Sequence, residues 1–199
     1  MESATFGRAP VTHPHAKGPP FLGRYTLPVP IPLPESPRLR YAPLVLDDAE
    51  FLVELLTDAD FLRYIGDRGV HSVADVGRYL AEGPWASYTT NGFGLLALRE
   101  TASGAPVGIA GLLKRPSLAD VDLGYALLPA FRGRGYAREA GAALLALAAA
   151  AFGLRRVIAI VTPDNAASIR TLTALGFRAE GRLRVGAADE VDCYALALG

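Results

Sequence analysis

The sequence predicts a single α+β domain in which helices pack on both faces of a mixed sheet. Three observations lead to this prediction. The chain has 199 residues, of which 51% are hydrophobic, and this is enough for one substantial core. Two apolar runs, residues 93–99 and 107–113, are separated by a Ser-Gly turn, which is typical of a β-hairpin. After Pro129, helical and strand patterns alternate, as they do in folds that bury a sheet between helices.

The first half of the domain is predicted to begin with a strand and two helices. Residues 39–45 have the alternation of a strand. A helix follows from Asp47, because the apolar residues within 51–56 recur with a helical period. A second helix is expected over residues 72–80, because Ser72 is followed three residues later by an aspartate, close to a capping box.

The second half is predicted to alternate between strands and helices. A strand over residues 120–128 stops at a proline. The elements expected after it are a helix over 135–152, a strand over 156–161, a helix over 166–175 and two final strands. Asn165 is a good N-cap and Gly176 a good C-terminal stop for the second of these helices.

The N-terminal segment differs in composition from the rest. Ten of the fifteen prolines lie in the first 43 residues, where they remove backbone donors and favour extended conformation. Residues 1–37 are therefore predicted to be an arm, either flexible or packed on the surface, and residues 38–199 the folded domain. His13 and His15 have no cysteine or acidic partner at ligand spacing, so no metal site is expected.

Charge and cysteine content limit the partners and the location. The formal net charge is zero, so no whole-molecule field attracts nucleic acid or anionic membranes, and neither is expected as a partner. The longest strongly apolar stretch, residues 140–152, is shorter than the roughly 20 residues that span a bilayer. Cys193 has no second cysteine to pair with, which favours a reducing, cytoplasmic location.

The most informative segment is a Gly-rich loop that opens into the long alanine-rich helix. Gly133 and Gly135 allow backbone angles that let consecutive N–H groups point to one place. The helix dipole and the unpaired first-turn amides add partial positive charge there, and Arg132, Arg134 and Arg138 add full charges. The segment predicts a phosphate site, although a tight turn with solvated arginines would have the same composition.

Two other phosphate motifs fit this loop poorly. A P-loop requires a Lys-Ser or Lys-Thr pair after its last glycine, and the loop has none. A dinucleotide-binding loop requires a third glycine at the position of Arg138.

The loop resembles a known family at this point. Arg132-x-x-Gly135-x-Ala137 is similar to the (Gln/Arg)-x-x-Gly-x-(Gly/Ala) pyrophosphate loop of the GNAT superfamily of N-acetyltransferases. The resemblance implies a GNAT-like fold, with a mixed, mostly antiparallel sheet of six to seven strands. It also implies an acyltransferase that uses acetyl-CoA and needs no metal.

Neighbouring segments extend the resemblance over residues 38–198. Residues 122–129 look like the central strand of the RimJ/RimL-like branch of this superfamily. Asn165-x-x-Ser168 and the Leu-Gly-Phe at 175–177 are similar to two further elements, in the same order along the chain.

The resemblance implies which residues contact the cofactor. Main-chain groups of the central strand would pair with the pantetheine arm, with Leu127 foremost, and the loop would hold the pyrophosphate. The residues implied are Ala126, Leu127, Leu128, Arg132, Gly133, Arg134, Gly135, Tyr136, Ala137, Arg138 and Asn165.

Catalysis requires a group that accepts a proton from the amine, because an alkylamine has a pKa of about 10.4. Asp122 is the candidate base, although a solvated strand-end carboxylate is an open alternative, and Glu82 and His71 are weaker candidates. Ser168 matches the proton donor to the departing thiolate in RimL-like enzymes, or is a helix first-turn hydroxyl. Leu172 occupies the position where several other GNAT enzymes have a tyrosine donor, so that version of the mechanism is excluded.

The acceptor is predicted to be a primary amine: a protein N-terminus, an amino acid or a small amine. Trp85 and Tyr88 follow the second helix in a predicted loop that would frame the acceptor pocket together with Tyr64, or these aromatics pack in the core. A catalytically silent acyl-CoA-binding module and a nucleotide-binding protein are the alternative functions. Either a monomer or a homodimer is consistent with the sequence.

Overall fold

The computed structural model of this protein describes residues 31–185 and 189–199. Most of the predicted Pro-rich arm, including His13 and His15, lies outside the described residues. In the part of the chain that is described, no helix combines the length and the apolar character that crossing a bilayer requires.

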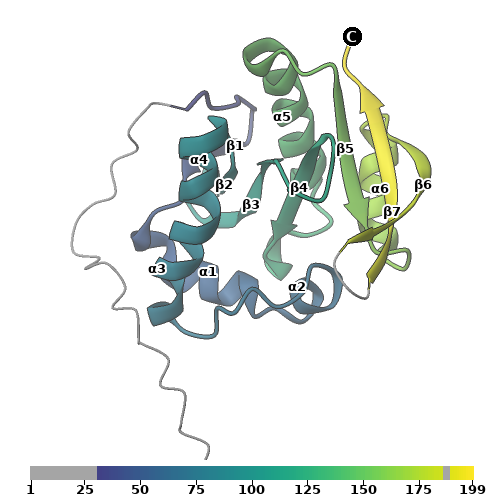
Figure 1. Ribbon diagram of the computed structural model, residues 1–199. Helices are drawn as coiled ribbons and strands as arrows, with labels where there is room; N and C mark the ends of the chain where they lie inside the picture. Colours follow the sequence, from purple (N-terminus) through teal and green to yellow (C-terminus); the bar gives the residue numbers. More distant parts are fainter. Residues whose placement is uncertain (1–30, 186–188) are drawn as a thin grey trace, which may run out of the picture.

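A single mixed sheet forms the centre of the molecule (Figure 1). Within the described residues it has seven strands, in the spatial order β1-β2-β3-β4-β5-β7-β6. The strands are β1 (Leu39–Pro43), β2 (Leu95–Glu100), β3 (Pro106–Leu113), β4 (Val121–Leu127), β5 (Arg156–Val161), β6 (Arg178–Val185) and β7 (Asp189–Ala197). All neighbours are antiparallel except β4 and β5, which are parallel. The predicted mixed, mostly antiparallel sheet is therefore confirmed.

Helices cover the sheet, as predicted. The α-helices are α1 (Ala49–Leu56), α2 (Ala59–Tyr64), α3 (Val73–Leu80), α4 (Ala86–Asn91), α5 (Tyr136–Phe152) and α6 (Ala166–Ala174). Figure 1 shows α1, α3 and α4 beside β1 to β3, and α6 beside β5 to β7. The long helix α5 packs against β3 and β4 and contacts α6. In β3, successive residues point to opposite faces, yet Val107, Ile109, Ala110 and Leu112 are all buried, so both faces of this strand are covered.

One prediction about the helices is wrong. The segment after Leu80, predicted to be a loop, continues as a π-helical turn (Ala81–Trp85) and then as α4. Pro84 lies in the π-helical turn, where the altered register accommodates its missing N–H. A proline inside a helix commonly breaks it, but here it lies at a change of helical pitch. The helix ends at Gly92, whose φ of +74° is a left-handed cap.

Helix α2 was not predicted from the sequence. The short helix α2 begins after Asp58, whose carboxylate accepts hydrogen bonds from the N–H groups of Asp60 and Phe61, each at 3.2 Å. Phe61 is buried, and it is the one buried residue of this helix. Six residues are too few for a clear hydrophobic period, so only the cap identifies the helix in the sequence.

Candidate active site

The sheet opens beside β4. The register of β4 with β5 covers only Val121 opposite Val157 and Asp122 opposite Ile158, although β4 continues beyond this point. The two strands therefore diverge after Asp122. Residues 123–127 keep β3 as a neighbour on one side, and on the other side no strand of the described residues pairs with them.

A hydrogen bond to β3 identifies the groups that face this open edge. The N–H of Leu128 donates to the carbonyl of Val107 at 2.9 Å. Because backbone groups alternate between the two sides of a strand, those of Tyr125 and Leu127 point away from β3, toward the open edge. The carbonyl of Leu127 accepts a bond there from Arg132 Nε at 3.0 Å. Such an edge can bind an extended chain that carries amides.

The Gly-rich loop follows this strand directly. After a 3-10 turn (Pro129–Phe131), Gly133 and Gly135 adopt left-handed φ angles of +73° and +82°. Gly135 is the N-cap of α5, and no side chain of a described residue caps the helix there. The first-turn amides of a 17-residue helix are thus left to a ligand, and the helix dipole makes that place favourable for an anion.

The three arginines of the loop differ in their surroundings. Arg132 forms ion pairs with Asp58 and with Asp60, the second at 2.7 Å, so its charge is balanced within the protein. Arg134 lies over an aromatic ring of the same loop, with 5.5 Å from its guanidinium carbon to the ring centroid. Arg138 is exposed and forms no ion pair with any described residue. Among the three, only Arg132 forms ion pairs with described residues, although the charge of Arg134 acts on the Glu100 carboxyl.

A pocket of about 830 Å³ extends from this loop along the open edge of β4. Its wall includes the two predicted catalytic residues, Asp122 and Ser168. Among the predicted cofactor-binding residues, those in the wall are Ala126, Leu127, Arg132, Gly133, Ala137 and Asn165. Those outside it are Leu128, Arg134, Gly135, Tyr136 and Arg138. Tyr136 is buried, and its hydroxyl donates to the Glu100 carboxylate, so this side chain serves the core.

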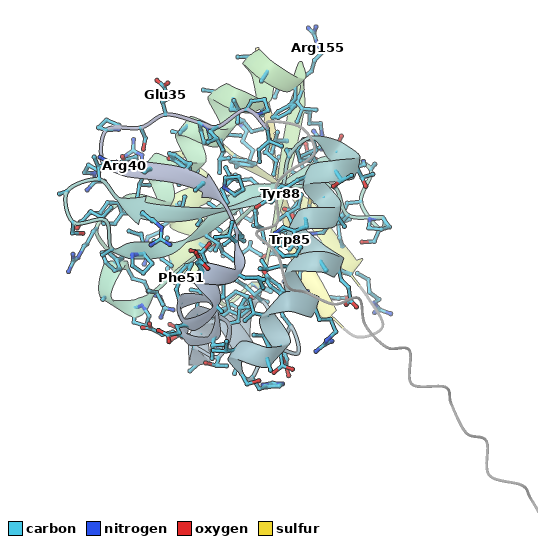
Figure 2. All side chains as sticks on the ribbon, turned by 90° about the vertical axis from the view of Figure 1, so that its left-hand side faces the viewer. Glu35, Arg40, Phe51, Trp85, Tyr88 and Arg155 are labelled. Carbon is cyan, nitrogen blue, oxygen red and sulfur yellow. The ribbon has the colours of Figure 1, made fainter. Side chains whose placement is uncertain are left out.

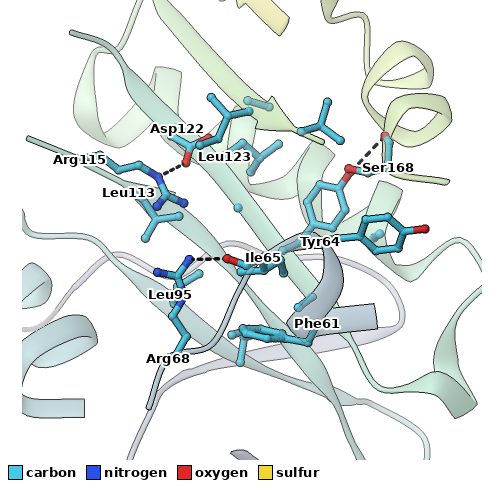
Figure 3. Close-up of a pocket in the computed structure, with 18 of the residues that line it drawn as sticks. Phe61, Tyr64, Ile65, Arg68, Leu95, Leu113, Arg115, Asp122, Leu123 and Ser168 are labelled. Carbon is cyan, nitrogen blue, oxygen red and sulfur yellow. Dashed lines mark hydrogen bonds and ion pairs between the residues drawn. The ribbon is translucent and has the colours of Figure 1, made fainter. Parts of the chain in front are cut away.

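Asp122 lies where β4 and β5 separate, and its carboxylate is almost fully buried. Oδ2 accepts a hydrogen bond from Arg115 Nε at 2.6 Å, whereas Oδ1 has no hydrogen-bond partner of good geometry among the described residues. Burial raises the pKa of the carboxyl above its ordinary value, and the charge and hydrogen bond of Arg115, together with the backbone N–H of Ile160, oppose this shift. The carboxylate is therefore a stronger base than a solvated one. Figure 3 shows the pair within the pocket.

Ser168 lies in the first turn of α6, which Asn165 caps by accepting a hydrogen bond from the N–H of Ser168 at 3.0 Å. Its Oγ is 2.8 Å from the hydroxyl of Tyr125, which also lines the pocket (Figure 3). Burial raises the pKa of Tyr125, so the phenol is protonated at neutral pH. Sequence reasoning missed Tyr125, because 43 residues separate it from its partner and only the fold brings the two together.

Trp85 and Tyr88 are not part of the pocket wall. Both are buried, and they are labelled in Figure 2. They anchor the backbone of Leu44: Trp85 Nε1 donates to the carbonyl of Leu44 at 2.8 Å, and the N–H of Leu44 donates to the hydroxyl of Tyr88 at 3.1 Å. These contacts support the packing interpretation of the two aromatics and not the substrate-binding one. Tyr64, from α2, does line the pocket.

The two weaker base candidates lie in different places. Glu82 is in the pocket wall, and His71 is not. His71 is exposed, with its Nε2 at 3.3 Å from a carboxylate oxygen of Asp67. Within residues 31–185 and 189–199, no three His, Cys, Asp or Glu side chains gather into a metal site.

Comparison with known proteins identifies the family. Residues 38–178 match the model of the acetyltransferase (GNAT) domain. The chain is 27% identical over 157 residues to the protein called "Uncharacterized N-acetyltransferase YoaA" of Bacillus subtilis, covering 77% of this chain and 86% of that protein. The chain therefore belongs to the GNAT acetyltransferase family, and it is an enzyme of the N-acetyltransferase type.

Solved structures share the fold. An acetyltransferase from Agrobacterium tumefaciens superposes with a TM-score of 0.72 and 23% identity, over 88% of this chain and all of that one. A spermidine N-acetyltransferase from Vibrio cholerae, crystallised with CoA and spermine, superposes with a TM-score of 0.66 and 15% identity, over 80% of this chain and 95% of that one. At these identities the likeness concerns the fold alone.

Proposed function

We propose that this protein transfers an acetyl group from acetyl-CoA to a primary amine of a protein N-terminus, an amino acid or a small molecule, by direct attack in a ternary complex. The open edge of β4 is the observation that carries the proposal. This edge begins at Asp122 and runs to the Gly-rich loop, so one groove joins a buried carboxylate to an anion site. The motif over residues 122–129 further supports membership of the RimJ/RimL-like branch. The single free cysteine supports a cytoplasmic location.

The residues present fit coenzyme A along the whole groove. Backbone groups of Tyr125 and Leu127 would pair with the amides of the pantetheine arm. The amides from Gly133 to the first turn of α5 would bind the pyrophosphate. Arg132 would fix the end of β4 in place through Leu127, because its charge is already balanced by Asp58 and Asp60.

Acetyl-CoA would supply an acetyl group activated as a thioester. The acceptor nitrogen loses two protons and the sulfur gains one, since the C–N bond forms as the C–S bond breaks. Asp122 takes the proton that the ammonium must lose before its neutral nitrogen attacks, because Oδ1 has no hydrogen-bond partner of good geometry among the described residues and burial raises the pKa of the carboxyl. The second nitrogen proton passes to solvent as the tetrahedral intermediate collapses. Ser168 gives a proton to the departing sulfur, and Tyr125, 2.8 Å away, replaces it.

The test is release of free thiol from acetyl-CoA in the presence of a panel of amines and peptides. Asp122→Asn and Ser168→Ala are expected to lower kcat by about 10²-fold or more while CoA affinity stays within a few-fold, because general acid–base catalysis contributes about 10²–10⁴-fold. Two matched controls lie close by in the chain. Asp120→Asn removes an exposed carboxylate that pairs with Arg156, and Thr173→Ala removes an exposed hydroxyl on α6. Both controls should retain full turnover.

Three outcomes decide between the hypotheses. CoA binding without thiol release for any acceptor would mean a silent acyl-CoA-binding module. Full turnover in both active-site variants would refute the assigned roles and leave the acetyltransferase activity intact. Greater thermal stabilisation by ATP than by CoA would refute the assignment of the loop.

A further inference from the structure

Two guanidinium groups lie at the end of the pocket that is remote from the Gly-rich loop. Arg115 follows β3, and Arg68 lies in the segment between α2 and α3, so two distant parts of the chain bring them to one wall. Figure 3 shows both in the same part of the pocket, near Leu95 and Leu113. Burial lowers the pKa of Arg68, and the charge of Arg115 lowers it further because the two cations repel each other.

The two arginines are not equally neutralised. Arg115 pairs with Asp122 at 2.6 Å. Arg68 donates one hydrogen bond to the carbonyl of Ile65, at 3.1 Å, and has no carboxylate within 4.0 Å among the described residues. Arg68 lines the pocket, and burial is the first cause of its lowered pKa, although the residue as a whole is exposed.

Other pocket residues leave this charge unbalanced. Burial raises the pKa of Tyr79 to about 12, so the phenol beside Arg68 is neutral at pH 7. Asp60 is committed to Arg132 at 2.7 Å. Glu82 is the one remaining acidic residue in the wall, and it forms no ion pair with a described residue. A partly desolvated cation without a counterion is unfavourable unless a ligand supplies the opposite charge.

We propose that the amine acceptor carries a carboxylate and that Arg68 binds this carboxylate while the amine reaches Asp122. The proposal rests on the transferase function proposed above and names its substrate class. A guanidinium presents two parallel N–H groups that match the two oxygens of a carboxylate. A polyamine would place a second ammonium near Arg68 and Arg115, where like charges raise its free energy. The acceptor is therefore a free amino acid or a peptide whose first residue is acidic.

The experiment measures kcat/KM by thiol release for acceptors that differ only in the carboxylate. Alanine is compared with alaninamide, and a peptide that begins with aspartate is compared with the same peptide that begins with asparagine. Spermidine is the polycationic acceptor. We expect the carboxylate member of at least one pair to be favoured on the order of tenfold to a hundredfold, the range for a hydrogen bond to a charged group. The pair that responds distinguishes a free amino acid from a peptide.

Variants of Arg68 assign the preference to this side chain. Arg68→Gln should remove the preference, mainly through a higher KM for the carboxylate acceptor, with unchanged thermal stability and CoA affinity. Arg68→Lys should restore part of the preference, because lysine keeps the charge without the planar fork. Arg40→Gln is the matched control: Arg40 is exposed on β1, outside the pocket wall, and its loss should change nothing (Figure 2).

The proposal has outcomes of its own that would overturn it. Equal kcat/KM for acid and amide in both pairs, a preference for spermidine, or a preference that survives Arg68→Gln would each refute the acidic acceptor while the transferase function stands. Absence of turnover with every acceptor, despite CoA binding, would refute the transferase function and the acceptor class together.

Discussion

Replacing Gly133 by valine separates the role of the Gly-rich loop in ligand binding from its role in the fold. Gly133 has a φ of +73°, and a Cβ added there would meet no atom within 4 Å. The cost in the free protein is therefore conformational and not steric, about 1–2 kcal/mol for an L-residue in the left-handed region. For a chain of this length, this corresponds to a fall in Tm of about 2–8 °C.

Gly153→Val provides the matched control at the opposite end of α5. Gly153 has a φ of +61°, and a Cβ there also meets nothing within 4 Å. The two variants should thus lose similar stability. Only Gly133 lines the pocket, so only its valine would crowd the place where the pyrophosphate is proposed to bind. Loss of one charge-assisted hydrogen bond, about 1.5–3 kcal/mol, corresponds to about tenfold to a hundredfold weaker CoA binding.

Calorimetric titration of CoA at fixed ionic strength, with thermal unfolding in parallel, measures both effects. We expect similar Tm values for the two variants and a weakened CoA Kd for Gly133→Val alone. If both variants bind CoA like the parent protein, main-chain capture of the pyrophosphate by this loop is refuted.

Three further predictions concern buried groups. Burial raises the pKa of Asp122 above its ordinary 3.8, so its contribution to stability is full below that pH and is lost as pH rises through the folded-state pKa. The free energy of unfolding in urea should therefore decline less with pH for Asp122→Asn than for the parent protein across this window. A Cβ on Gly111 would lie 2.1 Å from the carbonyl oxygen of Gly94, so Gly111→Ala should cost about 1–3 kcal/mol in urea unfolding, whereas Gly83→Ala, with open space around it, should not destabilise. Trp85→Phe removes a buried hydrogen bond and should cost about 1–3 kcal/mol in urea unfolding while the KM for the amine acceptor is unchanged; a raised KM would instead support a role of this residue in acceptor binding.

Local patterns were enough to predict much of the fold. The hairpin of β2 and β3, strand β4 before Pro129, and helices α5 and α6 depend on periodicity and caps that lie within about 20 residues. The Gly-rich loop is likewise a local feature, because two left-handed glycines and a helix start follow one another in the chain. The continuation of the helix through Pro84 could not be predicted, since buried contacts of Trp85 and Tyr88 with the backbone of Leu44 hold this segment in place.

The candidate site was less accessible from sequence, because its key contacts join distant positions. The hydroxyls of Tyr125 and Ser168 lie 2.8 Å apart although 43 residues separate them, and no local sequence pattern beside either residue predicts this contact. Sequence reasoning also assigned one role to all three arginines of the loop, since composition reports charge and not the counterions that balance it. Only the folded chain reveals that Asp58 and Asp60 neutralise Arg132.

The contrast between Arg132 and Arg68 follows from where their carboxylates lie. Asp58 both caps α2 and pairs with Arg132, which in turn bonds the carbonyl of Leu127. This chain of contacts ties α2, a wall of the acceptor end, to the edge of β4 where the cofactor is proposed to bind. Arg132 therefore positions the end of β4, because its charge is balanced by Asp58 and Asp60 within the protein. Arg68 has no such partner among the described residues, so its charge remains available to a ligand, and an acidic acceptor is the ligand that would match it.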